Sequence, residues 1–306
     1  MHLSVKTIIW IPLYLMLRFG GWCTTLVPRG QQRNLRKKLD RVALFVCERF
    51  AVPMVASFAH DNLKYRLYIN PARDVIGRES AIYGIHARYR VQASAHFIKP
   101  GATVLDVGAN AGALTVPLAL LAGRSGRVIA YEPNPHAYEL LEKNVGLNSL
   151  PQVTIRQYAL GEADGTLTFY ATGNDTARGS LKQLTSSDRG QSVPVFAYDT
   201  HDEGVPVSFV KIDVEGSELS VLKGMACMLE RLHPVLLCRV ISRLYYLGGE
   251  GTEKRKGILE FFRSRGYALS ALEDERGVQP LDETAFLEGK MRSFDIIAVF
   301  ESERPQ

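Results

Sequence analysis

The feature that most constrains this chain is a short apolar run that leads directly into a glycine turn. Residues 103–112 read T-V-L-D-V-G-A-N-A-G, and residues 113–121 have the composition of an apolar helix. The β-branched and aliphatic residues before the turn predict a buried strand. A strand, a glycine turn and a helix in succession open the nucleotide- or phosphate-binding unit of an α/β sheet. Asp106 interrupts the strand, and a buried carboxylate requires a partner.

The spacing of the glycines argues against a dinucleotide and against a P-loop nucleotide as the ligand. A dinucleotide fingerprint has the pattern G-x-G-x-x-G, but Asn110 stands where the second glycine is expected, between Gly108 and Gly112. No lysine follows at the position that a P-loop requires. An NAD-dependent oxidoreductase on the same fold therefore stays as an alternative that the spacing disfavours.

The next segment of the chain completes the unit. Residues 128–131 predict a second strand, which ends at Glu132, about twenty residues after the glycine turn, where an acid that binds ribose hydroxyls is expected. Asn134 and Pro135 have the residue types of a helix cap and a first helical position. After the third strand, the turn that begins at Ala159 is where an adenine would lie.

Strand and helix patterns alternate over the rest of the chain, which predicts a mostly parallel sheet with helices on both faces. The fold class expected is α/β, a doubly wound seven-stranded sheet whose last strand is antiparallel, preceded by a helical N-terminal arm. The strands are expected near 103–107, 128–131, 153–158, 207–212, 235–240, 267–272 and 294–300. Residues 165–170 and 191–198 predict further strands, and the Gly-, Ser-, Thr- and Asp-rich stretch 173–190 between them predicts a mobile loop or lid.

The N-terminal arm has a different character. Residues 7–17 are apolar but too few to cross a membrane, and residues 32–50 predict a basic amphipathic helix. Residues 1–50 hold nine Lys or Arg against two acids, a net charge of +7, so the rest of the chain carries −2 of the total of +5. Such an arm could lie on an anionic membrane surface or pack on its own domain with its charges solvated. We expect an arm over 1–50, a cap segment over 51–100 and a catalytic domain over 101–302.

Charge and cysteine content restrict partners and compartment. The balance of −2 outside the arm makes nucleic acid an unlikely partner. The four cysteines form neither a CxxC motif nor a metal-binding spacing, so a reducing cytoplasm is the simplest compartment, with peripheral attachment to the inner membrane surface as an option.

Five motifs, in order along the chain, resemble those of one protein family. They are VLDVGANAG, YEPNP, NVGLN, YALGEADG and KIDVEGSELSVLKG. Their combination is similar to that of the FkbM family of S-adenosylmethionine (SAM)-dependent methyltransferases, closely over about residues 95–240 and loosely over 255–300. The resemblance implies a class I methyltransferase fold, SAM as cofactor, and O-methylation of a hydroxyl on a small molecule, a sugar, a lipid-linked glycan or glycolipid, or a secondary metabolite.

The resemblance also assigns residues to the cofactor site. Asp106 and the glycine turn would line the methionine part, Glu132 would hold the ribose, Ala159 would border the adenine, and Asp213 would lie beside the reactive methyl group. The expected cofactor-binding residues are Asp106, Gly108, Ala109, Asn110, Gly112, Glu132, Pro133, Asn134, Ala159 and Asp213.

The chemistry of methyl transfer favours acids at the carboxyl end of a central strand, where ligands bind in open α/β sheets. Asp213 and Glu215 follow the predicted strand 207–212 and would point the same way if the chain stayed extended. We expect Asp213 to orient the acceptor or act as its base, and Glu215 to hold the acceptor or the start of the next helix. Lys211 shares their parity and could pair with one of the two acids. These three are the candidate catalytic residues, and no metal is expected.

One position departs from the family pattern. After the fifth strand the family commonly has P-x-I-I-x-E, whereas this chain reads P-V-L-L-C-R, with Arg239 in place of the glutamate. The departure motivates a second alternative, a catalytically diverged SAM-binding or membrane-attached scaffold protein.

Overall fold

The computed structural model describes residues 5–25, 29–60, 62–72, 75–83, 88–171, 179–180, 189–241, 250–273, 276–291 and 293–303. The chain divides into two compact units. The first holds residues 1–86 together with 174–178, and the second holds residues 87–173 and 179–306.

The first unit is built from two long helices, a hairpin and a short helix. The elements are α1 (Val5–Thr25), α2 (Arg29–Phe50), β1 (Met54–His60), β2 (Leu63–Ile69) and α3 (Val75–Tyr83). The two strands pair antiparallel, and α1 packs on both α2 and α3. Residues 62–70 alternate in polarity and predict a strand, which β2 confirms, whereas its partner β1 was not predicted. Among the described residues, no helix is long and apolar enough to cross a membrane.

The core of this unit is small. Trp10, Leu17, Ala43, Cys47 and Ile82 form a buried cluster, and aromatic and aliphatic side chains pack around it. Both long helices contribute to this cluster, α1 with Trp10 and Leu17 and α2 with Ala43 and Cys47.

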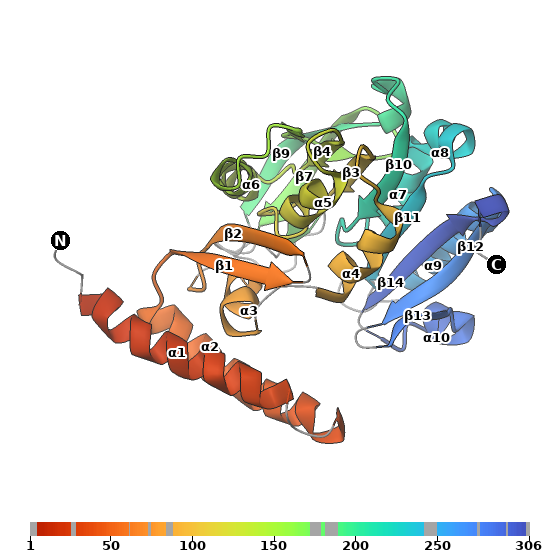
Figure 1. Ribbon diagram of the computed structural model, residues 1–306. Helices are drawn as coiled ribbons and strands as arrows, with labels where there is room; N and C mark the ends of the chain where they lie inside the picture. Colours follow the sequence, from red (N-terminus) through yellow and green to blue (C-terminus); the bar gives the residue numbers. More distant parts are fainter. Residues whose placement is uncertain are drawn as a thin grey trace. The chain divides into compact units, whose positions relative to one another are not determined.

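The second unit contains an eight-stranded sheet with the order β13-β12-β14-β11-β10-β3-β4-β5 (Figure 1). Its strands are β3 (Thr103–Val107), β4 (Arg127–Tyr131), β5 (Val153–Arg156), β10 (Val207–Ile212), β11 (Val235–Ile241), β12 (Tyr267–Glu273), β13 (Gly277–Pro280) and β14 (Ser293–Phe300). The strands β5, β4, β3, β10 and β11 are parallel neighbours, and β14 runs antiparallel between β11 and β12. The predicted doubly wound sheet with an antiparallel last strand is confirmed. The short edge strand β13 is an addition to the seven expected.

Helices cover both faces of this sheet. α4 (Arg88–Phe97), α5 (Thr115–Ala122) and α6 (Pro135–Leu147) pack along one face. α7 (Glu218–Gly224), α8 (Ala226–Leu232) and α9 (Glu250–Arg263) lie on the other, with α10 (Glu283–Glu288) packed on α9. The spacing of Leu219, Leu222, Met225 and Leu229 predicts a single helix over 217–230, but the structure has two helices that are separated at Met225.

The strands near 165–170 and 191–198 belong to a separate sheet and not to the main one. This four-stranded sheet has the order β6-β9-β7-β8 and consists of β6 (Ala159–Leu160), β7 (Gly165–Ala171), β8 (Gly179–Ser180) and β9 (Arg189–Phe196). It lies in the connection from β5 to β10, which also includes the short 3-10 helix η1 (Tyr198–Thr200). The lid expected over 173–190 lies outside the described residues, apart from the ends of these strands.

The order of the strands reverses between β3 and β10. From β3 the chain continues to β4 and β5 on one side, and from β10 it continues to β11 on the other. In open α/β sheets a ligand binds at the carboxyl ends of the strands at such a switch point. The sequence motifs of the glycine turn and of K-I-D-V-E-G both end there.

Candidate active site

The loop that joins β3 to α5 has an unusual backbone that its sequence permits. Gly108, Asn110 and Gly112 have φ values of 76°, 50° and 84°, in the region that favours glycine and tolerates asparagine. A Cβ atom on Gly108 would lie 2.0 Å from the carbonyl oxygen of Asp213. Glycine at this position therefore allows the segment after β10 to come directly against the loop.

The carboxylate of Glu132 joins this loop to the one that follows β4. Its Oε2 accepts the backbone N–H of Asn110 at 2.7 Å, and its Oε1 accepts that of Asn134 at 2.8 Å. Glu132 is buried, and burial raises its pKa to about 7, although the two backbone hydrogen bonds and Lys211 lower it. Each oxygen keeps a further lone pair with which it can accept a hydroxyl donor.

The start of α6 has the predicted cap. Asn134 accepts the N–H of His136 with its side-chain oxygen at 3.0 Å, and Pro135 is the first helical residue. Pro133 lies between the capping residue and Glu132. The cap at the start of α6 fixes the direction of the Asn134 backbone N–H. That N–H donates one of the two hydrogen bonds that hold the Glu132 carboxylate.

Asp106 has the partner that its burial requires. Its Oδ1 lies 2.9 Å from Nζ of Lys211, and its Oδ2 accepts the hydroxyl of Thr115 at 2.6 Å. Lys211 also donates to the carbonyl oxygens of Val107 at 3.3 Å and Gly108 at 2.5 Å. The prediction that Lys211 pairs with Asp213 or Glu215 is wrong, because neighbouring parallel strands place it directly beside Asp106. In this position Lys211 holds the start of the glycine loop through the carbonyl oxygens of Val107 and Gly108.

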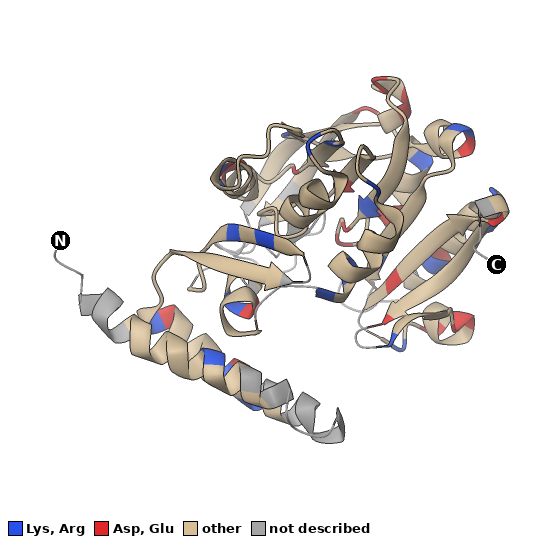
Figure 2. Cartoon of the chain, in the orientation of Figure 1, with Lys and Arg blue, Asp and Glu red and all other residues tan. Residues whose placement is uncertain are grey.

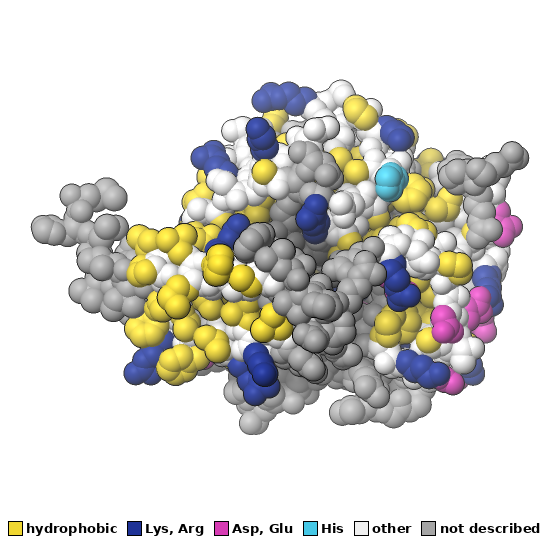
Figure 3. Space-filling view, turned by 60° about the horizontal axis from the view of Figure 1, so that its bottom comes forward, with side chains coloured by type: hydrophobic (Ala, Val, Ile, Leu, Met, Phe, Trp, Pro, Cys, Tyr) yellow, Lys and Arg dark blue, Asp and Glu magenta, His cyan; other side chains and the backbone are white. Residues whose placement is uncertain are grey.

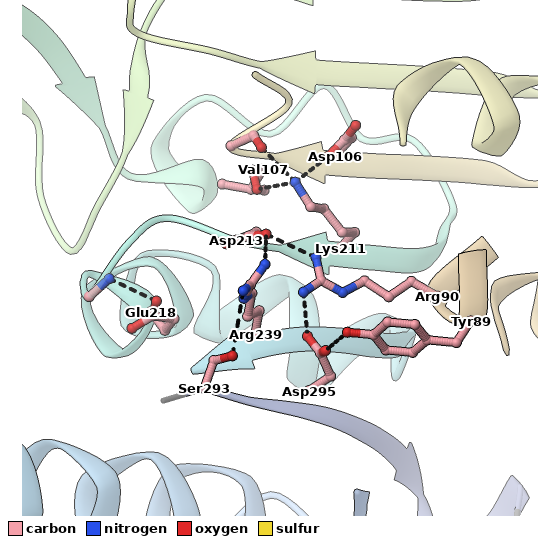
Figure 4. A network of polar contacts seen from close by, with 12 residues as sticks. Tyr89, Arg90, Asp106, Val107, Lys211, Asp213, Glu218, Arg239, Ser293 and Asp295 are labelled. Atoms are coloured by element: carbon pink, nitrogen blue, oxygen red, sulfur yellow. Dashed lines mark hydrogen bonds and ion pairs between the residues drawn. The ribbon is translucent and has the colours of Figure 1, made fainter. Parts of the chain in front are cut away.

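Asp213 lies at the carboxyl end of β10 in a network of charged side chains (Figure 4). Its Oδ2 is 3.1 Å from one guanidinium nitrogen of Arg90 and 3.7 Å from one of Arg239. The other terminal nitrogen of Arg90 lies 3.0 Å from Oδ1 of Asp295, whose Oδ2 accepts the hydroxyl of Tyr89 at 2.6 Å. The carboxylate of Asp213 is thus fixed in direction, and its side chain remains 17% exposed.

The turn after Asp213 does not continue the strand. β10 ends at Ile212, and Glu215 and Gly216 have φ values of 54° and 107°. The expectation that Asp213 and Glu215 point the same way from an extended chain is therefore wrong, because the chain turns between them. Glu218 holds this turn, since its Oε1 accepts the Gly216 N–H at 2.8 Å. Glu218 is fully buried, and burial raises its pKa to about 8.

The structure thus brings most of the expected site residues to one edge of the sheet. The glycine loop, Glu132, Lys211 and Asp213 meet at the strand switch point, while Ala159 lies in β6 of the smaller sheet, paired with Val195. No group of three or more His, Cys, Asp or Glu that could hold a metal ion occurs in the described part of the chain.

Four members of the site were not found from the sequence. Tyr89, Arg90 and Asp295 lie far from every motif, so no local signal could have singled them out. Glu218 could have been found, because it is the third acid in the stretch D-V-E-G-S-E and lies in the first turn of a helix.

Comparison with known proteins identifies the family of this chain. Residues 106–269, more than half of the chain, match the family model described as the methyltransferase FkbM domain. Methyltransferase 1 of Beauveria bassiana is 28% identical over 189 residues, which cover 55% of this chain and 72% of that protein. The hexuronic acid methyltransferase AglP of Haloferax volcanii is 30% identical over 135 residues, which cover 43% of this chain and only 53% of that protein.

A solved structure of the methyltransferase FkbM from Methylobacillus flagellatus aligns with 89% of this chain and 60% of its own, with a TM-score of 0.41 and 15% identity. The family match favours SAM over the nicotinamide alternative. The chain belongs to the FkbM family of SAM-dependent methyltransferases.

Proposed function

We propose that this protein transfers the methyl group of SAM to a hydroxyl oxygen of a sugar, a glycolipid or a secondary metabolite. The observation that supports it most is the position of Asp213. Its backbone lies against the glycine loop at Gly108, and its carboxylate, held by Arg90 at 3.1 Å, is partly open to solvent. A carboxylate beside the cofactor loop is suited to bind a hydroxyl acceptor. The name of AglP, which refers to a hexuronic acid, is consistent with a hydroxylated sugar acceptor.

The residues at the strand switch point suit SAM as the ligand. When bound, SAM supplies an electrophilic methyl group carried on a sulfonium. Glu132 offers a carboxylate, at the end of β4, to two ribose hydroxyls, and the left-handed glycine loop leaves its backbone open to a close approach. Asp106 and Lys211 support that loop from within the core.

Asp213 acts on the acceptor side. A guanidinium next to a carboxylate stabilises the ionised form, which accepts a hydrogen bond from the acceptor hydroxyl and orients its oxygen. The same carboxylate receives the proton that the hydroxyl loses as its oxygen is methylated. Glu215 follows in the same turn and is retained as a second candidate for contact with the acceptor.

The test is the formation of S-adenosylhomocysteine (SAH) by purified protein with SAM and a panel of hydroxylated acceptors, together with calorimetric titration of SAM. Binding of SAM with methyl transfer to a hydroxyl supports the proposal. Binding of SAM without transfer to any acceptor would contradict it and favour the diverged scaffold protein. Transfer only to nitrogen or carbon acceptors would also contradict it.

Glu132 gives this proposal a pH dependence. Ribose hydroxyls donate to the ionised carboxylate, so binding favours the ionised form and lowers the pKa of Glu132 from its unliganded value of about 7. The affinity for SAM is therefore expected to be constant above that pH and to fall below it, by up to about tenfold per pH unit. Calorimetric titrations from pH 5.5 upward measure it.

Two variants separate Glu132 from its neighbours in this experiment. Glu132→Gln is expected to bind SAM weakly with no slope below pH 7, because the amide does not titrate. Glu218→Gln removes another buried acid whose pKa is raised and is expected to keep the slope. A slope that persists in Glu132→Gln would assign the titration to another group.

We further propose that the first unit attaches the protein peripherally to an anionic membrane surface, where a lipid-linked acceptor would be found. Large apolar side chains are exposed on both long helices, at helical spacing on α1 (Figure 3). Their exposed fractions range from 36% at Leu35 to 69% at Met16, and the set is Ile11, Leu15, Met16, Phe19, Leu35, Val42, Leu44 and Phe45.

Exposed cations accompany this apolar surface. Lys38, Arg41 and Arg49 are exposed on α2, and Figure 2 shows blue segments along these helices. Apolar side chains that insert between headgroups, with cations that pair with lipid phosphates, are the two contributions that hold amphipathic helices at a membrane. The competing interpretation is that this surface packs against protein.

Sedimentation with vesicles of phosphatidylcholine alone, or mixed with phosphatidylglycerol, tests the attachment. The protein is expected to sediment with the anionic vesicles, and Phe19→Glu/Phe45→Glu is expected to lower the partition coefficient by at least about tenfold, since each fully buried aromatic contributes about 1.5–3 kcal/mol. Val278→Glu, at an exposed apolar residue of the second unit, is the matched control and should sediment normally. Equal sedimentation of all three proteins would refute membrane attachment.

A further inference from the structure

We infer that Arg239 forms an anion-binding subsite next to Asp213, so that the acceptor carries a carboxylate or phosphate close to the hydroxyl that is methylated. This inference rests on the proposed methyl transfer to a hydroxyl, and it specifies the chemical class of the acceptor.

The inference begins with a row of charges on one face of the main sheet. Asp106 and Lys211 are register neighbours on β3 and β10, and Arg239 and Asp295 are register neighbours on β11 and β14. Directly paired residues project from the same face of a sheet. Asp213 extends this row one step beyond β10.

Most charges in the row are matched at short distance. Lys211 pairs with Asp106 at 2.9 Å. Arg90 reaches the row from α4 and pairs with Asp213 at 3.1 Å and with Asp295 at 3.0 Å. Burial opposes the charge of Arg90, but the carboxylates of Asp295 and Asp213 outweigh it and raise the pKa of the guanidinium, so Arg90 stays charged and neutralises them.

Arg239 is the loosely held member of the row (Figure 4). Its contact with Asp213 is 3.7 Å, and its hydrogen bond to Ser293 Oγ is 3.4 Å. Both distances are longer than the roughly 2.7–3.2 Å that is usual between donor and acceptor in N–H···O hydrogen bonds. Its Nε is buried and, among the described residues, has no hydrogen-bond partner, yet the side chain as a whole is 27% exposed.

These contacts leave Arg239 available to a ligand. A guanidinium has five N–H donors in a planar fork that matches a carboxylate or a phosphate, and a charge-assisted bidentate pair is stronger than the long contacts seen here. Because Arg90 already pairs with Asp213 and Asp295, Arg239 can turn to an incoming anion without leaving either carboxylate unpaired. Because Arg239 is a neighbour of Asp213, the anion bound to it would lie next to the hydroxyl that Asp213 orients.

The alternative is that Arg239 only helps to neutralise Asp213. In that case its replacement would lower the thermal stability and the activity on all acceptors alike. An anion-binding role instead changes the relative use of charged and neutral acceptors, and this selectivity distinguishes the two.

The experiment uses three probes that share one ring, D-glucuronate, D-glucose 6-phosphate and D-glucose, with the full-length protein saturated with SAH. Binding is followed by saturation-transfer NMR and calorimetry on wild type, Arg239→Gln and Arg265→Gln. Arg265 is the matched control, since it is also partly exposed and pairs with Glu230 at 3.0 Å. It precedes the first residue of β12 and so lies away from the strand ends that carry Asp213.

At least one anionic probe is expected to bind wild type about tenfold to a hundredfold more tightly than glucose, which is the range for hydrogen bonds to charged groups. The preference should disappear in Arg239→Gln and remain in Arg265→Gln. The stronger of the two anionic probes identifies carboxylate or phosphate as the preferred group. Equal binding of all three probes, no binding of either anion, or a preference that survives in Arg239→Gln would overturn the subsite.

A parallel assay of SAH formation keeps this inference separate from the proposed function. Methyl transfer confined to neutral hydroxyl acceptors would refute the subsite and leave the proposed function intact. Anion binding that depends on Arg239, with no methyl transfer to any hydroxyl, would refute the proposed function and leave the subsite.

Discussion

Asp213→Asn is expected to lower kcat/KM for methyl transfer by about 10²–10⁴-fold, the range observed when a positioned proton-transfer group is removed. The amide keeps the shape of the side chain but carries no charge with which to align the acceptor hydroxyl or receive its proton. SAM binding should be retained within a few-fold, because the substitution leaves unchanged the backbone of Asp213, which lies against the glycine loop at Gly108. Initial rates of SAH formation, together with calorimetric titration of SAM, measure both quantities.

The control for this variant is Asp295→Asn. Both substitutions take one carboxylate from Arg90, which pairs with Asp213 at 3.1 Å and with Asp295 at 3.0 Å, so both should lower the free energy of unfolding. Only Asp213 follows the carboxyl end of β10, and only its replacement should cause the large catalytic loss. If both variants lose activity to the same extent, Asp213 acts through the stability of the network and not on the acceptor.

Gly108→Ala is expected to destabilise the protein by about 2–5 kcal/mol and to weaken SAM binding at least tenfold. The new Cβ atom would lie 2.0 Å from the carbonyl oxygen of Asp213, so the glycine loop or the end of β10 must move. Overpacking of this kind costs about 1–3 kcal/mol, and an alanine at positive φ adds roughly 1–2 kcal/mol. For a chain of this size the melting temperature should fall by about 3–8 °C, which differential scanning calorimetry measures.

Gly146→Ala is the matched control. Gly146 lies near the end of α6, and a Cβ atom there meets nothing within 4 Å. Alanine in a helix is favoured over glycine by about 0.5–1 kcal/mol, so this variant should be as stable as the wild type or slightly more stable. If Gly108→Ala behaves like Gly146→Ala, the close approach of β10 to the loop is not what requires glycine.

The sequence predicted the local units of the fold well. Periodicity and turn residues located the strands of the main sheet, because a buried parallel strand reads as a short apolar run. The Asn134 cap and Pro135 at the first position of α6 were also predictable, since both depend on neighbours within three residues. The two further strands between β5 and β10 were predicted, but not the separate sheet that they form, because the alternation of strands and helices does not say which strands pair.

The residues of the candidate site that belong to a sequence motif were predicted, and those that come from distant parts of the chain were missed. The glycine loop, Glu132 and Asp213 were found because strand ends and glycine spacing mark them in the chain. Asp106 was expected to need a partner, but its identity as Lys211 follows only from the register of β3 beside β10.

What the sequence alone determined is therefore the family, a doubly wound and mostly parallel sheet with an antiparallel last strand, and the edge of the sheet at which ligands bind. What only the tertiary structure decided is which charges meet there. Arg90 and Asp213 are 123 residues apart, and Tyr89 and Asp295 are 206 apart. Contacts over such separations depend on strand register and on how α4 packs across the sheet, and no local pattern records either. The same packing holds Arg90 between two carboxylates and leaves Arg239 only loosely bound.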